Sequence, residues 1–442
     1  MRTLGYLLAL SSIALACARP QVPVDGAFGA NPPLPAPRTA VVPTVNIAPA
    51  RGWEEGERPV AAHGLAVEPF AAGLDHPRWL YVLPNGDVLV AETNAPAGRR
   101  TTGVRDWLMK KVMKRTGAAV PSANRITLLR DADGDGRAEQ RSEFASGLNS
   151  PFGMALVGDA LYVANTDAVV RFTYHQDATS VFGEPQVVAR IPAGSINHHW
   201  TKNLIASPPS APRTLLYVAV GSNSNVGENG LDEEQGRALI LEIDPATGQS
   251  RTFASGLRNP IGLAWHPTTG ALWTVVNERD ELGDDLVPDY LTAVADGGFY
   301  GWPYSYFGPH VDPRVKPQAP ELVARATVPD YSLGSHTAPL GLVFYEGDLL
   351  REYSGGAFIG LHGSWNREVP SGYKVIFVPF RGGEPSGPPV DVLSGFVDAQ
   401  GEARGRPVGV AVDRAGALLV ADDVGNRVWR VTPAPVTADR IR

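Results

Sequence analysis

The sequence predicts an all-β protein that folds as a six-bladed β-propeller. First, a phrase of two short apolar strands joined by a tight turn occurs six times after residue 73. Second, 48 glycines and 39 prolines among 442 residues are typical of a chain rich in turns. Third, no amphipathic helix of globular length is evident after residue 120.

The N-terminal sequence predicts an export signal. One arginine precedes an apolar run from Leu4 to Ala16, which is too short to span a bilayer. The run ends at Cys17, the only cysteine, in a sequence that resembles the lipobox of bacterial lipoproteins. An ordinary signal peptide is the alternative. We expect an exported protein, in the periplasm or at the outer membrane, anchored through a lipid on Cys17 and without an intrachain disulfide.

The composition divides the chain into four parts. Residues 1–17 are the expected signal, and residues 18–60 are a Pro/Ala-rich linker expected to be an extended tether. Residues 61–435 are the expected propeller, followed by a C-terminal tail at residues 436–442. The basic stretch from residue 105 to 115 is expected to form a short helix inserted in the first blade.

The repeats define the blades. A small sheet cannot bury both of its apolar faces alone, so stacking such sheets around an axis stabilises all of them. The six copies begin at Gly73, Gly147, His199, Gly256, Ala338 and Gly405. A polar residue follows the second strand in most copies, and we expect these residues to face a common funnel unless they merely end their strands: Glu92, Asn165, Ser222, Asn277 and Asp422.

Charge and motifs exclude several classes of function. The formal net charge is −7 and the basic residues are scattered, which argues against nucleic acid as a ligand. The sequence has no P-loop, G-x-S-x-G, H-E-x-x-H or cysteine cluster.

The pair His198 and His199 opens the third copy. On a strand the two side chains point to opposite sides, so at most one faces the funnel, where it could act as a general base. A hydrogen-bonded histidine at a strand edge is the alternative. Arg258 and Asn259 precede the proline of the fourth copy, and an arginine at a funnel mouth suits an oxyanion or a carboxylate.

Two acidic stretches suggest cation binding. Residues 277–290 hold six acidic residues in fourteen, a density that suits a hard cation with oxygen ligands, although a solvated acidic loop is the alternative. The candidate ligands are Glu278, Asp280, Asp284 and Asp285. Residues 131–139 resemble the start of a calcium loop, but Ser142 stands at the twelfth position, so we expect a turn with at most weak calcium binding.

Two loops carry further candidate residues. The stretch 297–310 is rich in aromatic residues between glycines and prolines, which is typical of a pocket wall. The stretch 361–374 adds His362, Trp365, Asn366 and Arg367 at the fifth copy.

Seven segments in order, over about residues 60–432, resemble the sorbosone dehydrogenase branch of the soluble quinoprotein sugar dehydrogenases. They are GLDHPRWLYVLPNGDVLVAETN, INHHWTKNL, GLRNPIGLAW, NERDELGDDLVPDYLT, GGFYGWPYSYFG, HGSWNR and GRPVGVAVD. The resemblance implies a six-bladed propeller, pyrroloquinoline quinone (PQQ) as cofactor with calcium polarising its carbonyl, a sugar or sugar aldehyde as substrate, and an external electron acceptor.

The resemblance also implies roles for individual residues. His199, placed by the H-x-x-x-x-L pattern of HWTKNL, corresponds to the base that removes the hydroxyl proton as hydride moves to the quinone. Arg258 and Asn259 correspond to residues that hold the quinone and its developing charge. Arg406 and Arg367 correspond to positions that bind the cofactor, and residues 277–285 correspond to a stretch associated with calcium or the rim of the site.

Two other functions fit a six-bladed propeller. A calcium-dependent lactone hydrolase would hold its metal with Glu92, Asn165 and Asp422, but would leave His199 and Arg258 without a role. A non-catalytic lipoprotein that binds a glycan or a protein is favoured if His199 points into a blade.

Overall fold

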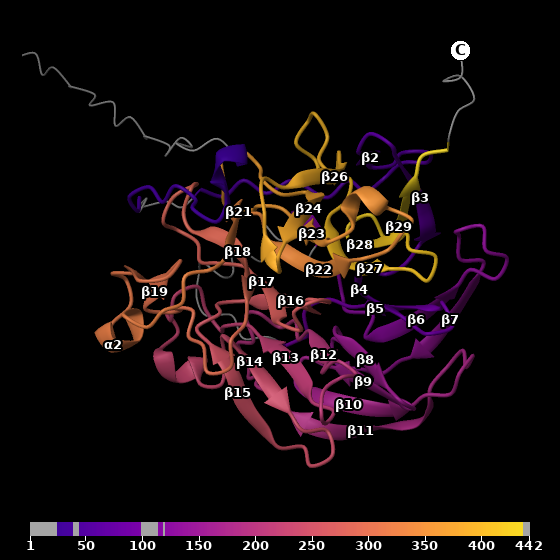
Figure 1. The fold of residues 1–442 in the computed structure, drawn as a ribbon, viewed down its shortest axis with the longest axis horizontal. Coiled ribbons are helices and arrows are strands. Elements are labelled where there is room, and N and C mark those ends of the chain that lie inside the picture. The colour runs from indigo at the N-terminus through magenta and orange to yellow at the C-terminus, as the bar shows by residue number, and fades with distance from the viewer. Residues whose placement is uncertain (1–23, 39–43, 99–113, 118–119, 436–442) are drawn as a thin grey trace, which may run out of the picture.

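A computed structural model describes residues 24–38, 44–98, 114–117 and 120–435. Its strands form six blades around a central axis (Figure 1), which confirms the predicted propeller. The one α-helix of the described residues is the short α2 (Pro320–Val323), and no helix there is long and apolar enough to cross a membrane. The expected signal with Cys17, the tail at 436–442 and nearly all of the helix expected at 105–115 lie outside the described residues.

Each blade is an antiparallel sheet of four main strands. The innermost strands are β4 (Pro77–Val82), β8 (Met154–Val157), β12 (Leu204–Ala206), β16 (Pro260–Trp265), β22 (Pro339–Tyr345) and β27 (Pro407–Val412). The second strands are β5 (Val88–Glu92), β9 (Ala160–Ala164), β13 (Leu216–Val220), β17 (Leu272–Val276), β23 (Gly356–Leu361) and β28 (Leu418–Asp422). The six repeats found in the sequence are these strand pairs.

The outer half of each blade comes from more variable sequence. The third strands are β6 (Arg125–Arg130), β10 (Ala168–Thr173), β14 (Leu239–Ile243), β18 (Pro288–Ala293), β24 (Lys374–Arg381) and β29 (Arg427–Pro433). The fourth strands are β7 (Gln140–Ala145), β11 (Phe182–Arg190), β15 (Ser250–Ser255), β21 (Tyr331–Ser335), β26 (Val390–Ser394) and β3 (Leu65–Ala72).

Short elements decorate the blades. Two-residue strands β1 (Phe28–Gly29) and β2 (Val60–Ala61) extend the fourth and fifth blades at β21 and β26. The pair β19 (Ser305–Tyr306) and β20 (His310–Val311) forms a hairpin, and β25 (Glu384–Pro385) pairs with β24. The 3₁₀ turns are η1 (Val24–Ala27), η2 (Lys114–Thr116), η3 (Leu231–Glu234) and η4 (Arg351–Tyr353).

The ring closes through the two ends of the propeller sequence. Strand β3 pairs with β29, from Leu65 opposite Pro433 to Ala72 opposite Arg427. The sixth blade therefore combines three strands from the C-terminal part with one from the N-terminal part. This pairing ties the N-terminal part of the propeller to the last blade and so closes the ring of blades.

Burial explains why the second strands are the clearest signal in the sequence. Every residue of β5, β9, β13, β17, β23 and β28 is buried. Both faces of such a strand are covered by neighbouring blades, so it is a continuous apolar run. The fourth strands are more exposed, except for β21, which is buried throughout, and β11 is exposed at seven of its nine residues.

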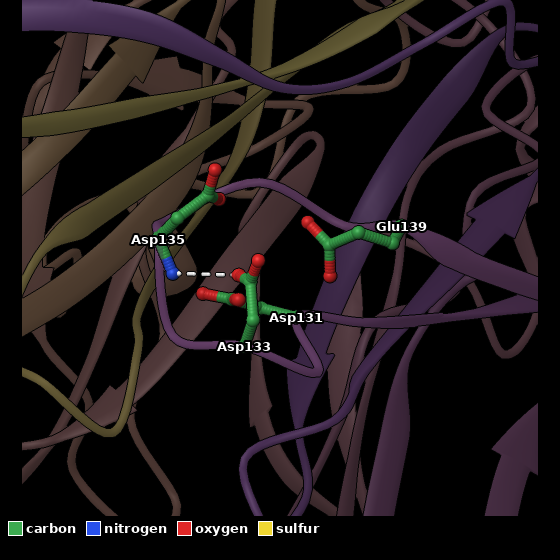
Figure 2. Close-up of side chains that lie close together, drawn as sticks. All are labelled: Asp131, Asp133, Asp135 and Glu139. Carbon is green, nitrogen blue, oxygen red and sulfur yellow. Dashed lines mark hydrogen bonds between the residues drawn. The ribbon is translucent and has the colours of Figure 1, made fainter.

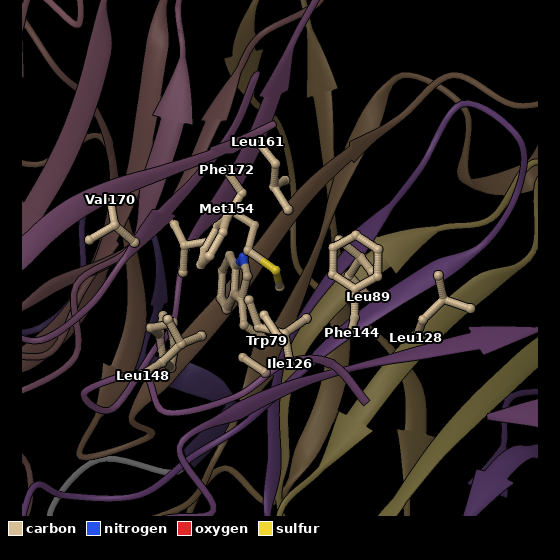
Figure 3. Packing of buried hydrophobic residues seen from close by; sticks show 14 of the residues in the cluster. Trp79, Leu89, Ile126, Leu128, Phe144, Leu148, Met154, Leu161, Val170 and Phe172 are labelled. Carbon is tan, nitrogen blue, oxygen red and sulfur yellow. The ribbon is translucent and has the colours of Figure 1, made fainter. Parts of the chain in front are cut away.

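The core lies between the blades. Figure 3 shows one such layer, in which Trp79 of the first blade packs among Phe144, Met154 and Phe172. The rings of Trp79 and Phe152 lie 4.9 Å apart at their centroids, and Phe152 packs edge-on against Trp200 at 6.3 Å. This apolar layer includes Trp200, the residue that follows His199. Its close packing therefore fixes the chain next to His199.

The beginnings of the innermost strands define one end of the propeller, which we call the site face. Pro77 pairs with Glu92, and Pro407 pairs with Asp422, so each innermost strand begins where the second strand ends. The predicted residues Arg258 and Arg406 lie just before the innermost strands β16 and β27, and His199 lies in the loop that leads into β12. Because the blades share one orientation, the fold brings these residues to the same face.

The segment predicted as an extended linker packs on the propeller in its described parts. The Arg38 amide donates to Leu282 O at 2.9 Å, and the Asn46 amide donates to Trp365 O at 2.9 Å. The ring of Trp53 is buried edge-on against Phe396 and Trp429, with centroids 5.6 and 5.3 Å away. These contacts lie at the site face, so the segment differs from a free tether there.

Candidate functional site

His199 is held in one orientation and one tautomer. Its Nδ1 lies 2.9 Å from the backbone oxygen of Ser222 and 3.0 Å from the Ser222 hydroxyl, which itself donates to Ser224 O. A carbonyl oxygen can only accept, so Nδ1 carries the proton and Nε2 carries the lone pair. The ring is partly exposed, whereas His198 is exposed. Of the two histidines, His199 therefore has the geometry of a general base.

The surroundings keep His199 neutral. Burial lowers its pKa well below the usual 6.5, and the nearby charges of His198, Arg258 and Arg237 lower it further. Arg237 donates to the His199 backbone oxygen at 3.0 Å, and the buried Lys202 ammonium donates to the same oxygen at 3.2 Å. These two cations fix the backbone of the histidine and disfavour a third positive charge on its ring.

A glycine brings the third and fourth blades into contact beside His199. A Cβ on Gly221 would lie 2.6 Å from His199 Cβ and 2.2 Å from Asn259 Oδ1, so only glycine fits there. The Ser222 amide donates to Arg258 O at 2.8 Å. Three of the predicted site residues, His199, Arg258 and Asn259, are therefore brought together.

Arg258 is buried and fully oriented. Its Nε and Nη2 donate to the backbone and side-chain oxygens of Asn225, each at 3.1 Å. Its Nη1 donates to the backbone oxygens of Asn277 at 3.3 Å and Glu278 at 2.7 Å. Its ion pair with Asp280 is long, at 3.4 Å. The guanidinium is thus held mainly by neutral oxygens.

A second charged group lies on the first, fifth and sixth blades. Asp423 accepts hydrogen bonds from Arg78 at 2.5 Å and His362 at 2.9 Å, and His76 lies 3.5 Å away. Burial raises the pKa of Asp423, but His362, His76 and Arg78 outweigh it and leave the pKa far below the usual range. Burial lowers the pKa of His76 to about 4. A permanent carboxylate therefore orders three basic side chains.

The two groups meet at Trp200. The Arg78 guanidinium lies over the Trp200 ring, 5.7 Å from its centroid, and Trp200 follows His199 directly. On the other side, Asp280 joins Arg258 to Asn366, whose Nδ2 donates to it at 2.6 Å. The site residues thus form a nearly continuous ring around the site face.

Arg406 and Arg367 complete the cations of this ring. Arg406 donates to Ala48 O at 3.0 Å and lies over the Tyr373 ring, 5.2 Å from its centroid. Arg367 pairs with Asp285 at 3.0 Å. Both arginines are buried, with 6% and 2% of their surface exposed. Each therefore has a fixed position, as a binding residue requires.

The side chains proposed as metal ligands are occupied by protein contacts. Asp280 pairs with His336 at 3.4 Å and accepts from Asn366; burial raises its pKa, but these partners and Arg258 leave it lowered. Asp284 Oδ2 accepts from the Glu368 amide at 2.7 Å. Glu278 pairs with the buried Arg279 at 3.0 Å. These contacts give the acidic stretch a structural role at the rim.

The other acidic stretch does gather carboxylates, but away from this ring. Asp131, Asp133, Asp135 and Glu139 each bring one oxygen within 4.8 Å of the others in the β6–β7 turn (Figure 2). The Asp131 carboxylate accepts the amides of Gly134 at 2.7 Å and Gly136 at 2.9 Å. The stretch forms a turn, as predicted, and its carboxylates cap that turn.

Two of the strand-ending polar residues have purely structural partners. Glu92 is paired with Arg125 and also accepts from Thr127 and the Asp75 amide. Asp422 accepts from Trp53 and Trp429 at 2.7 and 3.0 Å, and from the amides of Arg406 and Gly425 at 2.8 Å. The carboxylates that a lactone hydrolase would use for its metal are therefore filled.

The aromatic loop also differs from its predicted role as a pocket wall. Tyr300, Trp302, Tyr306 and Phe307 are all buried, and three of them belong to the core of the fourth blade. The Trp302 indole donates to Asn225 O at 3.0 Å, beside Arg258. The loop thus supports the site from outside.

Sequence reasoning missed Arg78, Asp423 and Arg237. Arg78 stands in the first repeat two residues after His76, and Asp423 follows the strand-ending Asp422 in the last. Comparing the same repeat position across all six copies would have selected both. No motif marks Arg237, because its partners at 192–199 and 222 are known only from the fold.

Several polar atoms in the ring are buried and lack a hydrogen-bond partner among the described residues. They are Nε of Arg78, Arg406 and Arg367, Nε2 of His76, Oδ1 of Asn259 and Oδ1 of Asp423. Unsatisfied buried polar atoms are costly and rare in native proteins. The three arginine Nε atoms are donors and suit negatively charged groups of a polar ligand, whereas the Asn259 and Asp423 oxygens are acceptors and would need donors.

Comparison with known proteins assigns the chain to a family. A family model described as TrAA12-like matches residues 59–289 and 319–434. The chain belongs to the TrAA12-like family. The match covers all six blades and omits residues 290–318, which include the aromatic loop, as well as the segment before residue 59.

Relatives of the TrAA12-like chain include sugar dehydrogenases. It is 28% identical over 302 residues to an uncharacterised protein of Borreliella burgdorferi, covering 65% of this chain and 76% of that protein. It is 25% identical over 273 residues to a PQQ-dependent sugar dehydrogenase of Hypocrea jecorina, covering 56% of this chain and 57% of that enzyme. The resemblance read from the seven segments is confirmed at the level of the family.

Solved structures agree in fold. The holo PQQ domain of a pyranose dehydrogenase from Coprinopsis cinerea superposes with a TM-score of 0.67 and 20% identity. The match covers 88% of this chain and 100% of that domain.

Proposed function

We propose that the protein is a PQQ-dependent dehydrogenase that oxidises a sugar or sugar aldehyde of the aldose or sorbosone type. Electrons would pass to an external acceptor, a quinone or a cytochrome. The observation that carries the proposal is a neutral, oriented His199 inside a ring of buried arginines with unsatisfied polar atoms. The sugar dehydrogenases among its relatives support the same activity.

The ring fits an anionic quinone. PQQ carries three carboxylates, and arginine forks bind carboxylates well. Arg258, Arg406 and Arg78 would hold it, with Asn259 as a further polar partner and Arg367 at the rim. When bound, PQQ supplies a quinone that takes up two electrons, and calcium polarises its carbonyl.

His199 would act on the sugar hydroxyl. Its Nε2 accepts the hydroxyl proton while Nδ1 donates to the Ser222 carbonyl, which stabilises the imidazolium that forms. The positive charge of Arg258 stabilises negative charge that develops at the site during the transfer. Arg237 and Lys202 hold the histidine in place as its charge changes.

The test is a titration of the purified protein with PQQ and calcium, followed by addition of sorbosone and a panel of aldoses. We expect the quinone absorbance to change on binding and again on reduction by sugar. His199→Ala should lower the rate of reduction by about 10²- to 10⁴-fold while PQQ still binds. The exposed His63→Ala is the matched control and should behave as the unmodified protein.

Absence of PQQ binding in the presence of calcium would contradict the proposal and favour a propeller that binds a glycan or a protein. Export and lipid anchorage through Cys17 belong to the same proposal. Metabolic labelling with a fatty acid, lost in Cys17→Ser, would test the anchor.

A further inference from the structure

A stretch of ten residues lies across the site face. Residues 44–53, which we call the strap, precede the region matched by the family model at residue 59. The Thr44 hydroxyl donates to Asp284 at 3.4 Å at one end, and the Trp53 indole donates to Asp422 at 2.7 Å at the other. The strap therefore spans loops of the fourth, fifth and sixth blades.

The middle of the strap grips the loop that carries Arg367. The Asn46 amide donates to Trp365 O at 2.9 Å, and its side-chain Nδ2 donates to Glu368 O at 2.7 Å. Asn46 also forms a parallel bridge with Asn366. Asn46 thus contacts the chain on both sides of Arg367, which limits the positions of the Arg367 backbone.

Two residues further on, the strap reaches Arg406. The Ala48 carbonyl accepts from Arg406 Nη2 at 3.0 Å, and this is the one hydrogen bond of that guanidinium among the described residues. Ala48 itself is buried, at 4% exposure. Main-chain hydrogen bonds between Ala403 and the strap at Pro49 and Arg51, both 2.7 Å long, hold the register.

The Arg406 guanidinium is bound by a carbonyl oxygen of the strap rather than by a carboxylate. A carbonyl orients a guanidinium without neutralising it, whereas a carboxylate does both, as Glu92 and Asp75 do for the surface Arg125. Arg406 is therefore oriented by a neutral acceptor, and its Nε has no hydrogen-bond partner in the described part of the chain. Such an arginine is ordered in advance for an anion, and ordering in advance lowers the cost of binding.

We propose that the strap is a positioning element of the site, which fixes Arg406 and the Arg367 loop and thereby sets the affinity for a carboxylate-bearing cofactor. The cofactor part of this inference rests on the proposed function. The strap adds to the family's propeller an element from outside its matched region.

The test replaces residues 44–48 by a Gly/Ser stretch of equal length in the full chain. We expect the affinity for PQQ, titrated with calcium present, to fall by about tenfold or more. Hydrogen exchange at residues 365–368 and 403–406 should rise in the cofactor-free protein, while its thermal midpoint stays close to that of the unmodified protein. A role confined to general stability would move the midpoint and leave the ratio of affinities near one.

Single substitutions test the same proposal if the variant with the Gly/Ser stretch does not fold. Asn46→Ala should raise exchange at 365–368 and weaken PQQ binding by a smaller factor, about threefold. Val45→Ala is the matched control, because Val45 is adjacent to Asn46 and is 45% exposed. Unchanged exchange, or raised exchange with unchanged affinity, would overturn the proposal. If the unmodified protein binds no PQQ, the proposed function fails, and the exchange data alone decide whether the strap fixes the two loops.

Discussion

At the scale of single residues, the site depends on which side chains are kept neutral and which are kept charged. Burial lowers the pKa of His199, and the nearby basic groups His198, Arg258 and Arg237 lower it further. Asp423 is surrounded by basic groups as well, but there they hold a carboxylate in its charged form. One environment thus keeps an imidazole neutral, and the other keeps a carboxylate charged among basic side chains.

The lowered pKa of His199 predicts a pH profile. A base works only when neutral, and a pKa below 6.5 means that His199 stays neutral as the pH falls through that value. We expect kcat/KM for the sugar to remain level down to pH 6.5 and to fall only at lower pH. A profile that falls already above pH 7 would show that the base is another group or that the ring is solvated.

Arg237 is predicted to act through His199. Its guanidinium bonds to the backbone oxygens of Pro192, Ala193, His199 and Ser222 and to the Asn197 side chain. Arg237→Met removes both the clamp and a positive charge, so we expect kcat to fall by about 10²-fold and the acid limb of the profile to move to higher pH.

Arg237→Lys provides the comparison, because it keeps the charge and loses most of the clamp. The acid limb should stay near its original position in this variant although kcat falls. Equal shifts of the limb in both variants would contradict an electrostatic role for Arg237.

At the scale of elements, the site face is built from the loops that enter the innermost strands and leave the second strands. At three positions these loops approach one another so closely that only glycine, which has no side chain, fits. Gly221 follows β13 and lies between His199 and Asn259. Gly405 and Gly425 likewise leave room for the Asp422 carboxylate, within 2.3 Å of where their Cβ atoms would lie.

Gly221→Ala tests this packing. The added methyl would meet Asn259 Oδ1 at 2.2 Å and His199 Cβ at 2.6 Å, so both residues must move. We expect both PQQ affinity and kcat to fall by about tenfold or more, since displacements near 1 Å can cost 10²-fold in rate. Gly158→Ala is the control away from the site, because the turn has open space around the added methyl group and only its φ of +60° disfavours alanine. Equal effects of the two changes on kcat would refute the argument.

At the scale of the whole molecule, stability depends on the closure between β3 and β29. Val67 lies in this closing strand, is 4% exposed and packs with Trp429 and Val431 in one apolar cluster. Separating β3 from β29 would expose the apolar core of the last blade and of the two sheets that pack against it. The propeller should therefore unfold as one unit.

Val67→Asp places an unpaired charge in this closure, and we expect it to lower the free energy of unfolding by roughly 3 kcal/mol or more. Ala66→Asp, on the adjacent and half-exposed position, should change it by less than about 1 kcal/mol. Denaturant unfolding followed by tryptophan fluorescence measures both. Similar losses in the two variants would mean that β3 does not close the ring.

The sequence determined the number of blades, their inner strand pairs and part of the site. A buried second strand such as β5 or β13 needs a continuous apolar run, and the residues before each innermost strand recur at one place in the repeat, so local pattern reveals both. Arg258 and Asn259 were singled out at such a place, and His199 was singled out by the histidine pair and the H-x-x-x-x-L pattern. The patterns that mark these residues are formed by residues close together in the sequence, so the sequence alone shows them.

Only the tertiary structure decided the remainder of the ring and its cover. Arg78 meets Asp423 across 345 positions, and Trp53 meets Asp422 across 369. The Ala48 carbonyl that holds Arg406 belongs to a Pro/Ala-rich stretch with no signal for binding, because a backbone oxygen is the same in every residue. These contacts exist because closing the ring brings the first and last blades together, and sequence spacing does not record that closure.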